Sequence, residues 1–227
     1  MKLNYKQYGD SGPYVVIVHG LFGMLDNWHN MAKNLSAHFR VVSVDVRNHG
    51  NSAHHPSMTY EDICDYFNEL LKDLSIPKAH FIGHSMGGKT AMLFATKYPE
   101  LVSKLIVADI SPRFYPVHHD TILEGLSFLD FNILKSRGDA DDALSDYIKD
   151  FGIRQFLLKN LYWVNKGKLG LRINLEVLKK EIAEAEKKGK GAAKKEELAL
   201  DYKKKFASPY RAAELGYIDE VIKPEET

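Results

Sequence analysis

Short apolar stretches alternate with longer amphipathic ones through the first half of the chain. The apolar stretches are rich in β-branched residues and are apolar on both faces; they are Tyr14–Val18, Val41–Val46, Ala79–Ile82 and Leu105–Ala108. Such runs are typical of strands that are covered on both sides in a parallel sheet. The intervening stretches predict helices at Trp28–Ala37, Thr59–Leu74 and Gly87–Lys97. Strands that alternate with helices imply βαβ units, and Leu3–Tyr8 adds an outer strand, so the pattern predicts an α/β fold.

The alternation stops after residue 111, where a different pattern begins. Three short helices and then a hairpin turning at Asn165-Lys166-Gly167 are predicted, at Thr121–Leu129, Ala140–Lys149, Ile153–Asn160 and Leu161–Ile173. A block of this kind, inserted after a strand of an α/β sheet, usually forms a cap over the ligand crevice. Residues 1–111 are therefore predicted to form the core of the fold, and residues 112–178 a helical cap with a return segment.

The composition changes again at residue 179. The segment Lys179–Lys205 contains ten lysines and six acidic residues, and Gly189 and Gly191 interrupt its helical pattern. Because charges of both signs are mixed, a solvated helix–linker–helix is favoured over a binding patch. Apolar residues return in Phe206–Thr227. Residues 179–227 are thus predicted to be a charged linker followed by a small tail.

Charge and cysteine content narrow the class of protein. The 31 basic and 30 acidic residues nearly cancel in a chain of 227 residues, which argues against a nucleic acid as partner. Hydrophobic residues make up 44% of the chain, enough for a sizeable core, but no apolar stretch approaches 18 residues, so no membrane partner is expected. A single cysteine, Cys64, fits a reducing compartment, and the sequence predicts a cytoplasmic protein.

The clearest chemical motif surrounds Ser85. The residues Gly83-His84-Ser85-Met86-Gly87 follow one apolar run directly and precede a helical stretch. This is the G-x-S-x-G pattern of a serine nucleophile on a sharp strand-to-helix turn, where small residues two positions on either side let the backbone close tightly. The turn raises the hydroxyl above the sheet and directs the next backbone N–H toward a developing oxyanion. The motif therefore predicts acyl transfer at Ser85.

The same residues also match a phosphate-binding loop. Gly83 to Thr90 fit G-x-x-x-x-G-K-T, in which Lys89 would contact phosphates and Thr90 would bind magnesium. However, the earlier run Tyr14–Val18 ends in a second glycine-rich turn, His19-Gly20-Leu21-Phe22-Gly23. An acyl-transfer site needs such a turn to present a second N–H to the oxyanion, whereas a nucleotide site has no evident need for it. The hydrolase interpretation is favoured, and nucleotide binding remains the alternative.

An acid is predicted for the site, but a base is missing from its usual place. Asp109 ends the Leu105–Ala108 strand, where it would orient an imidazole and stabilise its cation. In this arrangement the chain order is serine, acid and then histidine, yet all ten histidines precede residue 120. His118 and His119, which follow the acid, are the candidate substitute bases. His19 and His49 lie in turns and are better explained as local hydrogen-bonders.

Four motifs together resemble the small carboxylesterases of the α/β-hydrolase superfamily, from residue 1 to about residue 178. They are His19–Gly23, Asp45–Ser52 with its R-N-H-G-x-S turn, Gly83–Gly88 and Ala108–Pro112. The resemblance implies Ser85 as nucleophile, Asp109 as acid and the backbone N–H groups of Leu21 and Met86 as the oxyanion hole. It implies short to medium acyl esters or thioesters as substrates, with no metal and no organic cofactor.

The last part of the chain departs from that family. Such esterases continue through further strands with the histidine between them, so a partial α/β-hydrolase fold without its last strands is expected. Residues 196–227 instead are similar to the C-terminal end of the carboxyltransferase subunit of biotin-dependent acyl-CoA carboxylases. We therefore expect a truncated or chimeric chain with impaired turnover. A non-catalytic binding or assembly module stays open as an alternative, because an unpaired sheet edge invites self-association; a carboxylase tail fragment is another.

Overall fold

The computed structural model describes residues 2–112 and 119–190. The first of these two parts contains five strands: β1 (Tyr5–Tyr8), β2 (Tyr14–Val18), β3 (Arg40–Val44), β4 (Ala79–His84) and β5 (Val102–Ala108). Between them lie the 3-10 helices η1 (Leu25–Trp28) and η2 (Pro99–Leu101) and the helices α1 (His29–Leu35), α2 (Tyr60–Asp73) and α3 (Met86–Lys97). The predicted α/β alternation is confirmed, with β2 at the predicted bounds.

The five strands form one sheet in the order β1-β3-β2-β4-β5, in which only β1 is antiparallel to its neighbour. Register brings three loops to the same edge of this sheet. Val18 lies opposite Gly83, and His84 lies opposite Ala108. The turn after β2, the residues after β4 and the residue after β5 are therefore neighbours, since the carboxyl ends of parallel strands meet at one edge.

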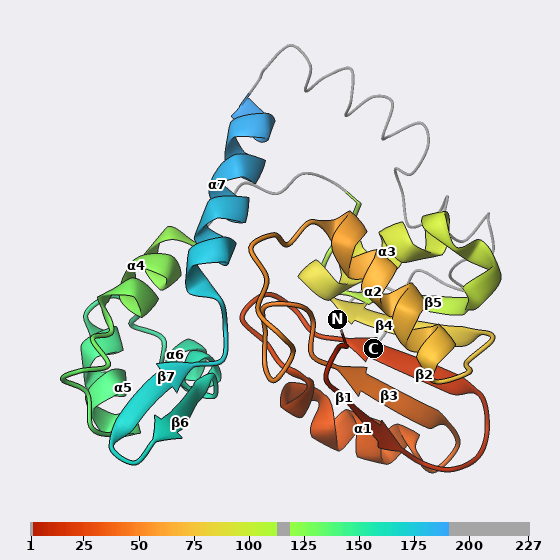
Figure 1. Cartoon of the computed structure of the whole chain (residues 1–227), viewed down its shortest axis with the longest axis horizontal. Helices are drawn as coiled ribbons and strands as arrows, with labels where there is room; N and C mark the ends of the chain where they lie inside the picture. The colour runs from red at the N-terminus through yellow and green to blue at the C-terminus, as the bar shows by residue number, and fades with distance from the viewer. Residues whose placement is uncertain (1, 113–118, 191–227) are drawn as a thin grey trace, which may run out of the picture.

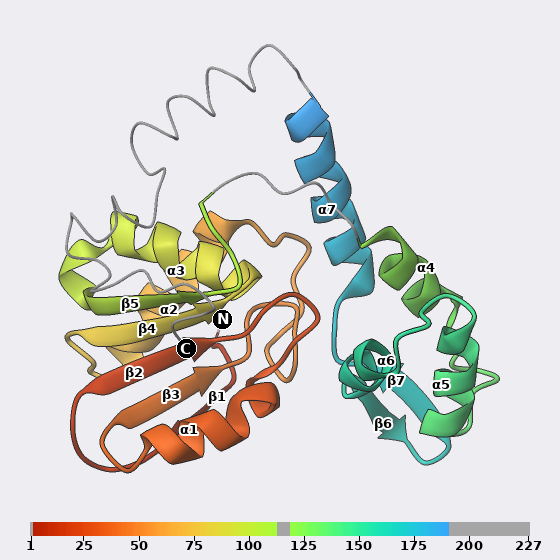
Figure 2. The ribbon, with the colours of Figure 1, turned by 180° about the vertical axis from the view of Figure 1, so that it is seen from behind.

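Helices cover both faces of the sheet, as Figures 1 and 2 show from opposite sides. Alternate residues of β2 point to different faces: Val16 and Val18 pack in the larger cluster with α2 and α3, whereas Val15 and Ile17 pack in a smaller cluster with Ala32 of α1. All four valine and isoleucine side chains are at most 3% exposed. Coverage on both faces explains why the strands are continuous apolar runs.

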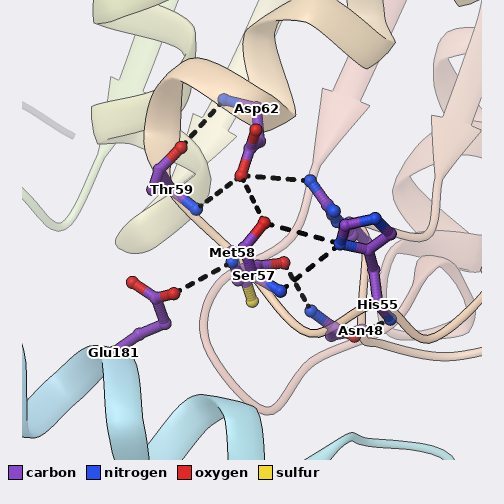
Figure 3. Close-up of polar contacts among 8 residues, drawn as sticks. Asn48, His55, Ser57, Met58, Thr59, Asp62 and Glu181 are labelled. Carbon is purple, nitrogen blue, oxygen red and sulfur yellow. Dashed lines mark hydrogen bonds and ion pairs between the residues drawn. The ribbon is translucent and has the colours of Figure 1, made fainter.

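The start of α2 is fixed by a polar cluster (Figure 3). Thr59 caps the helix by accepting a hydrogen bond from the Asp62 amide, and Asp62 accepts one from the Thr59 amide in return. The Asp62 carboxylate also accepts a hydrogen bond from the Ser57 hydroxyl at 2.9 Å and pairs with Arg47 at 3.1 Å. Arg47 is only 2% exposed, so this ion pair fastens the loop after β3 to the helix that follows it.

The second described part forms a lobe beside the sheet (Figures 1 and 2). It contains α4 (Asp120–Phe128), α5 (Arg137–Ser145), α6 (Phe151–Leu158), the hairpin strands β6 (Leu161–Asn165) and β7 (Lys168–Leu171), and α7 (Leu175–Lys190). The predicted helices and hairpin are present here. The helix expected at Ala140–Lys149 begins earlier and ends earlier, because Ser136 and Asp139 form a capping box that starts α5 at Arg137.

Two other predicted boundaries differ from the structure. The helix expected at Trp28–Ala37 is the shorter α1, and the 3-10 helix η1 that precedes it was not predicted; η1 forms because the Asn27 side chain accepts a hydrogen bond from the Met24 amide at 2.7 Å. The boundary placed between residues 178 and 179 falls inside the continuous helix α7. The tail predicted at residues 206–227 lies outside the described residues. None of the helices in the described part has the length and apolar content needed to cross a membrane.

Candidate active site

Ser85 occupies a strained turn between β4 and α3. Its backbone has φ 52° and ψ −119°, a region that a non-glycine residue adopts only at a cost of about 1–3 kcal/mol. The turn requires glycine on the helix side: a Cβ atom on Gly87 would lie 2.4 Å from the carbonyl oxygen of Val18 and 2.5 Å from that of His19. The Ser85 amide donates to the Ala108 carbonyl oxygen at 3.0 Å, which fixes the turn to β5. The elbow predicted from G-x-S-x-G has the expected backbone.

The glycine-rich turn after β2 lies against this elbow. A Cβ atom on Gly20 would be 3.2 Å from the Ser85 Cβ atom, so only a glycine allows the approach. The Gly20 carbonyl oxygen accepts hydrogen bonds from the Gly23 amide at 3.0 Å and from His19 Nδ1 at 2.8 Å. Because N–H and C=O of a trans peptide point in opposite directions, anchoring the Gly20 carbonyl also sets the direction of the Leu21 N–H.

Two backbone amides and one hydroxyl at this edge keep their hydrogen-bonding capacity. In residues 2–112 and 119–190, neither the Leu21 nor the Met86 N–H has a hydrogen-bond partner, and the Ser85 hydroxyl has none either. By contrast, the Phe22 N–H donates to His49 Nε2 at 3.2 Å. The Leu21 and Met86 amides are therefore among the N–H groups of the two turns that keep a free donor for a ligand.

His19 and His49 are structural imidazoles. Val46 donates its N–H to His19 Nε2 at 2.9 Å, so the proton of this ring is on Nδ1. His49 follows the same pattern: Nε2 accepts from Phe22 and Nδ1 donates to the Arg47 carbonyl oxygen at 3.0 Å. Burial lowers the pKa of His19 to about 4 and that of His49 to about 3. Both rings are neutral at pH 7 with both nitrogens occupied, as expected for local hydrogen-bonders, so neither serves as the base.

Asp109 lies directly after β5, in a backbone conformation with φ 55°. Its carboxylate is 3.6 Å from His84 Nε2 and its side chain is 85% exposed. His84 precedes the nucleophile in the chain, and its ring Nδ1 would be 2.9 Å from a Cβ atom on Gly20. The predicted acid is therefore at the predicted edge of the sheet, with His84 as its ionic neighbour.

The two substitute bases predicted from the sequence have different outcomes. His118 lies outside the described residues. His119 is the residue before α4, and its ring lies edge-on to the Phe22 ring, with the ring centroids 5.8 Å apart. Phe22 belongs to the glycine-rich turn, so the chain does bring His119 back toward the nucleophile edge.

The phosphate-loop alternative does not fit the geometry. Thr90, which would have to reach a magnesium ion, is fully buried and donates its hydroxyl hydrogen to the Met86 carbonyl oxygen at 3.0 Å. Ser85 breaks the smooth loop that would wrap a phosphate. In the part of the chain that the structure describes, no three His, Cys, Asp or Glu side chains cluster as they would around a metal ion. Cys64 is buried in the core, which raises its pKa to about 12.

Sequence reasoning missed the residue that ties these loops together. The Asp45 carboxylate, 1% exposed, accepts hydrogen bonds from the Leu25 amide at 2.7 Å, the Asn51 amide at 2.8 Å and the Asn4 side chain at 2.6 Å. A Cβ atom on Gly50 would lie 2.2 Å from this carboxylate. The signal was the D-x-R-N-H-G sequence, in which an acid at a strand end precedes a glycine.

Comparisons with known proteins agree with this geometry. A family profile described as the alpha/beta hydrolase fold matches residues 13–132. The sn-1-specific diacylglycerol lipase ABHD11 of Danio rerio is 42% identical over 176 residues, which cover 74% of this chain and 55% of that protein. Esterase YbfF of Escherichia coli strain K12 is 36% identical over 165 residues, covering 70% of this chain and 65% of that protein.

Solved structures include a marine microorganism esterase with a TM-score of 0.79 and 38% identity, covering 81% of this chain and 73% of that chain. The chain spans about half the length of the diacylglycerol lipase that it matches. A second profile, described as the carboxyl transferase domain, matches residues 176–227. Only residues 176–190 of that match, which belong to α7, lie in the described part.

Proposed function

The chain belongs to the α/β-hydrolase family, and on that basis we propose that it is a serine hydrolase acting on short to medium acyl esters or thioesters through an acyl-enzyme at Ser85. One observation carries the proposal. The strained backbone at Ser85 presents a hydroxyl at the sheet edge, beside the amides of Leu21 and Met86, which have no hydrogen-bond partner among the described residues. The names of the relatives, an esterase and a diacylglycerol lipase, support an ester as the substrate.

The reaction proceeds in two halves. Ser85 Oγ attacks the acyl carbon, its proton passes to a base, and the carbonyl oxygen becomes an oxyanion held by the Leu21 and Met86 amides. The C–O or C–S bond then breaks, and the alcohol or thiol leaves with the proton. Water repeats the sequence on the acyl-enzyme and releases the carboxylic acid and Ser85. Every step uses groups of the protein, so we propose no metal and no organic cofactor.

We further propose that this chain turns over slowly. The support is the position of its histidines: His19 and His49 are occupied, and His84 lies beside Asp109. We propose Asp109 as the triad acid and His119, whose ring lies edge-on to the Phe22 ring, as the candidate base among the described residues. If no base accepts the Ser85 proton, one member of the triad is missing, and such a loss typically lowers the rate by several powers of ten.

The decisive experiment compares the wild-type chain with Ser85→Ala. We expect slow hydrolysis of p-nitrophenyl acetate and slow labelling by a fluorophosphonate probe in the wild type, and neither in Ser85→Ala. The label should map to the peptide that contains Ser85. A wild-type rate equal to that of Ser85→Ala, together with no label on Ser85, would remove the proposal. Hydrolysis as fast as in an intact esterase would instead contradict the slow turnover.

A non-catalytic assembly role is the second candidate. Ile106 on β5, at one end of the described sheet order, is 56% exposed, which favours self-association along this side. Light scattering tests this: a dimer or larger species that dissociates in Ile106→Lys supports it, and a monomer at all concentrations excludes it.

The similarity of residues 176–227 to a carboxyl transferase domain supports a carboxylase-derived tail, which we propose takes no part in ester hydrolysis. A cytoplasmic location is likewise proposed, on the basis of the lone buried thiol of Cys64.

A further inference from the structure

A buried asparagine side chain of the lobe formed by residues 119–190, which we call the cap, contacts the glycine-rich turn His19–Gly23 directly. Asn160 follows α6 and is 0% exposed. Its Nδ2 donates to the Phe22 carbonyl oxygen at 2.8 Å and to the Leu157 carbonyl oxygen at 3.1 Å, and its backbone carbonyl accepts from the Arg172 amide at 2.9 Å. The contact with Phe22 joins residues 138 positions apart in the sequence. It places one side chain of the cap on the turn that faces the nucleophile.

From Phe22 a chain of hydrogen bonds leads to the Leu21 amide. The peptide that contains the Phe22 carbonyl also contains the Gly23 N–H, which donates to the Gly20 carbonyl oxygen at 3.0 Å. The Gly20 carbonyl in turn belongs to the peptide of the Leu21 N–H. An amide whose carbonyl accepts a hydrogen bond is a stronger donor through its N–H, because bonds in a chain polarise one another. The Asn160 contact therefore orients and strengthens the Leu21 N–H.

One buried atom of Asn160 lowers the stability of the fold, and a residue with a purely structural role would not need it. In the described part of the chain its Oδ1 atom is buried without a hydrogen-bond partner. A buried acceptor without a partner typically costs about 1–3 kcal/mol, whereas an apolar residue of similar shape has no such penalty. An amide at this position is explained if the hydrogen bond from Nδ2 to the Phe22 carbonyl oxygen is needed, because leucine, which has a similar shape, cannot donate it.

We propose that Asn160 is a positioning residue for the oxyanion hole. Its hydrogen bond to Phe22 couples the contact between the cap and the turn to the Leu21 amide, through Gly23 and Gly20. The inference rests on the proposed function, in which the Leu21 amide stabilises the oxyanion. It adds to that function a residue from the cap, so that the hole is complete only when the cap lies against the turn.

A matched control comes from another contact between the same two lobes. Glu181 of α7 accepts a hydrogen bond from the Met58 amide at 3.2 Å, as Figure 3 shows. This contact also links the cap side to a loop of the core, but it lies at the start of α2, away from Gly20–Gly23. Glu181→Ala therefore removes a contact between the lobes without touching the hydrogen-bond chain to Leu21.

Amide hydrogen exchange by NMR, on the full-length chain, tests the coupling. In Asn160→Leu we expect the Gly23 amide to exchange about tenfold faster than in the wild type, because the peptide loses its fixed carbonyl. The β4 amides should keep their protection, and Glu181→Ala should leave the Gly23 rate unchanged. Asn160→Ala serves as a second variant if the leucine is not accommodated. Equal Gly23 exchange in wild type and Asn160 variants, or equal acceleration by Glu181→Ala, would overturn the proposal.

The rate of hydrolysis then distinguishes positioning from mere packing. In Asn160→Leu we expect kcat for p-nitrophenyl acetate to fall about tenfold with KM unchanged, since the interaction matters in the transition state. An unchanged kcat alongside faster Gly23 exchange would overturn the catalytic part of the proposal. If wild type and Ser85→Ala hydrolyse equally, the proposed function itself fails, and the exchange data still decide whether Asn160 holds the turn.

Discussion

The two halves of the candidate site are built very differently. The nucleophile half consists of Ser85 in its elbow and the glycine-rich turn after β2. That turn is fixed by buried hydrogen bonds, because His19 Nδ1 donates to the Gly20 carbonyl oxygen and His49 Nε2 accepts from the Phe22 amide. The acid–base half consists of Asp109, 85% exposed, and His84, 40% exposed, which lie 3.6 Å apart. One half is held in place by buried hydrogen bonds, while the other is open to water.

The difference shows which part of hydrolase chemistry a sheet edge supplies by itself. An oxyanion hole needs only backbone N–H groups in fixed positions, and strands with tight turns provide them. Proton transfer needs a side chain with a suitable pKa within hydrogen-bond reach of the hydroxyl. That side chain must come from a loop, so the two halves are separable in sequence. Each of the following measurements tests whether the two halves are as unequal as the contacts indicate.

Gly87→Ala is expected to have the largest effect. The added Cβ atom would lie within 2.5 Å of two backbone carbonyl oxygens, which have no freedom to move. We expect a loss of about 4 kcal/mol or more in the free energy of unfolding, measured by urea denaturation.

Gly167→Ala is the matched control for that substitution. Gly167 has a positive φ, 81°, which Gly87 does not have, and no atom lies within 4 Å of an added Cβ. The expected loss is about 1 kcal/mol from backbone strain alone. Similar losses in the two variants would show that the nucleophile half is not tightly packed.

The second largest effect is expected from low pH, which should lower the free energy of unfolding through His19 and His49 in the nucleophile half. His19 and His49 have pKa values lowered from 6.5 to about 4 and about 3, so the unfolded chain binds protons more readily than the folded protein. The stability from the neutral rings is complete above pH 6.5 and is lost as the pH falls toward 4. We expect a loss of about 2 kcal/mol per ring between pH 7 and pH 5. Urea denaturation at several pH values measures it, and His49→Gln should flatten the pH dependence.

The smallest effects are expected in the acid–base half. Asp109→Asn and His119→Ala should each change the Ser85-dependent hydrolysis of p-nitrophenyl acetate by less than about threefold, because in the described residues Asp109 lies beside His84 and His119 beside Phe22, and neither side chain is hydrogen-bonded to Ser85. In an intact triad the loss of the acid costs about four powers of ten. A hundredfold loss in His119→Ala would identify this residue as the base and would break the comparison.

Much of the nucleophile half was predictable because its signals are local. The run Tyr14–Val18 must be a strand covered on two faces, and glycines on both sides of Ser85 admit few backbone arrangements. These features depend on residues within a few positions of one another. The sequence therefore predicts where the elbow and the glycine-rich turn follow their strands.

The remaining parts depend on contacts between distant segments. Nothing near Asn160 indicates that its amide meets Phe22, and nothing near His119 indicates that its ring packs on the same residue. The 3-10 helix η1 was missed because it depends on one side-chain hydrogen bond of Asn27. The boundary predicted between residues 178 and 179 follows a change in composition, whereas the backbone of α7 continues through it.

Asp45 has a consequence for how this edge of the molecule opens. One carboxylate accepts from Leu25, Asn51 and Asn4, so three segments from different places in the chain share a single acceptor. Withdrawing any one of them leaves a buried negative charge with fewer donors and weakens the hold on the other two. We therefore expect the entrance to β1, the start of η1 and the loop after β3 to open together, and the turn that faces Ser85 to lose support when they do.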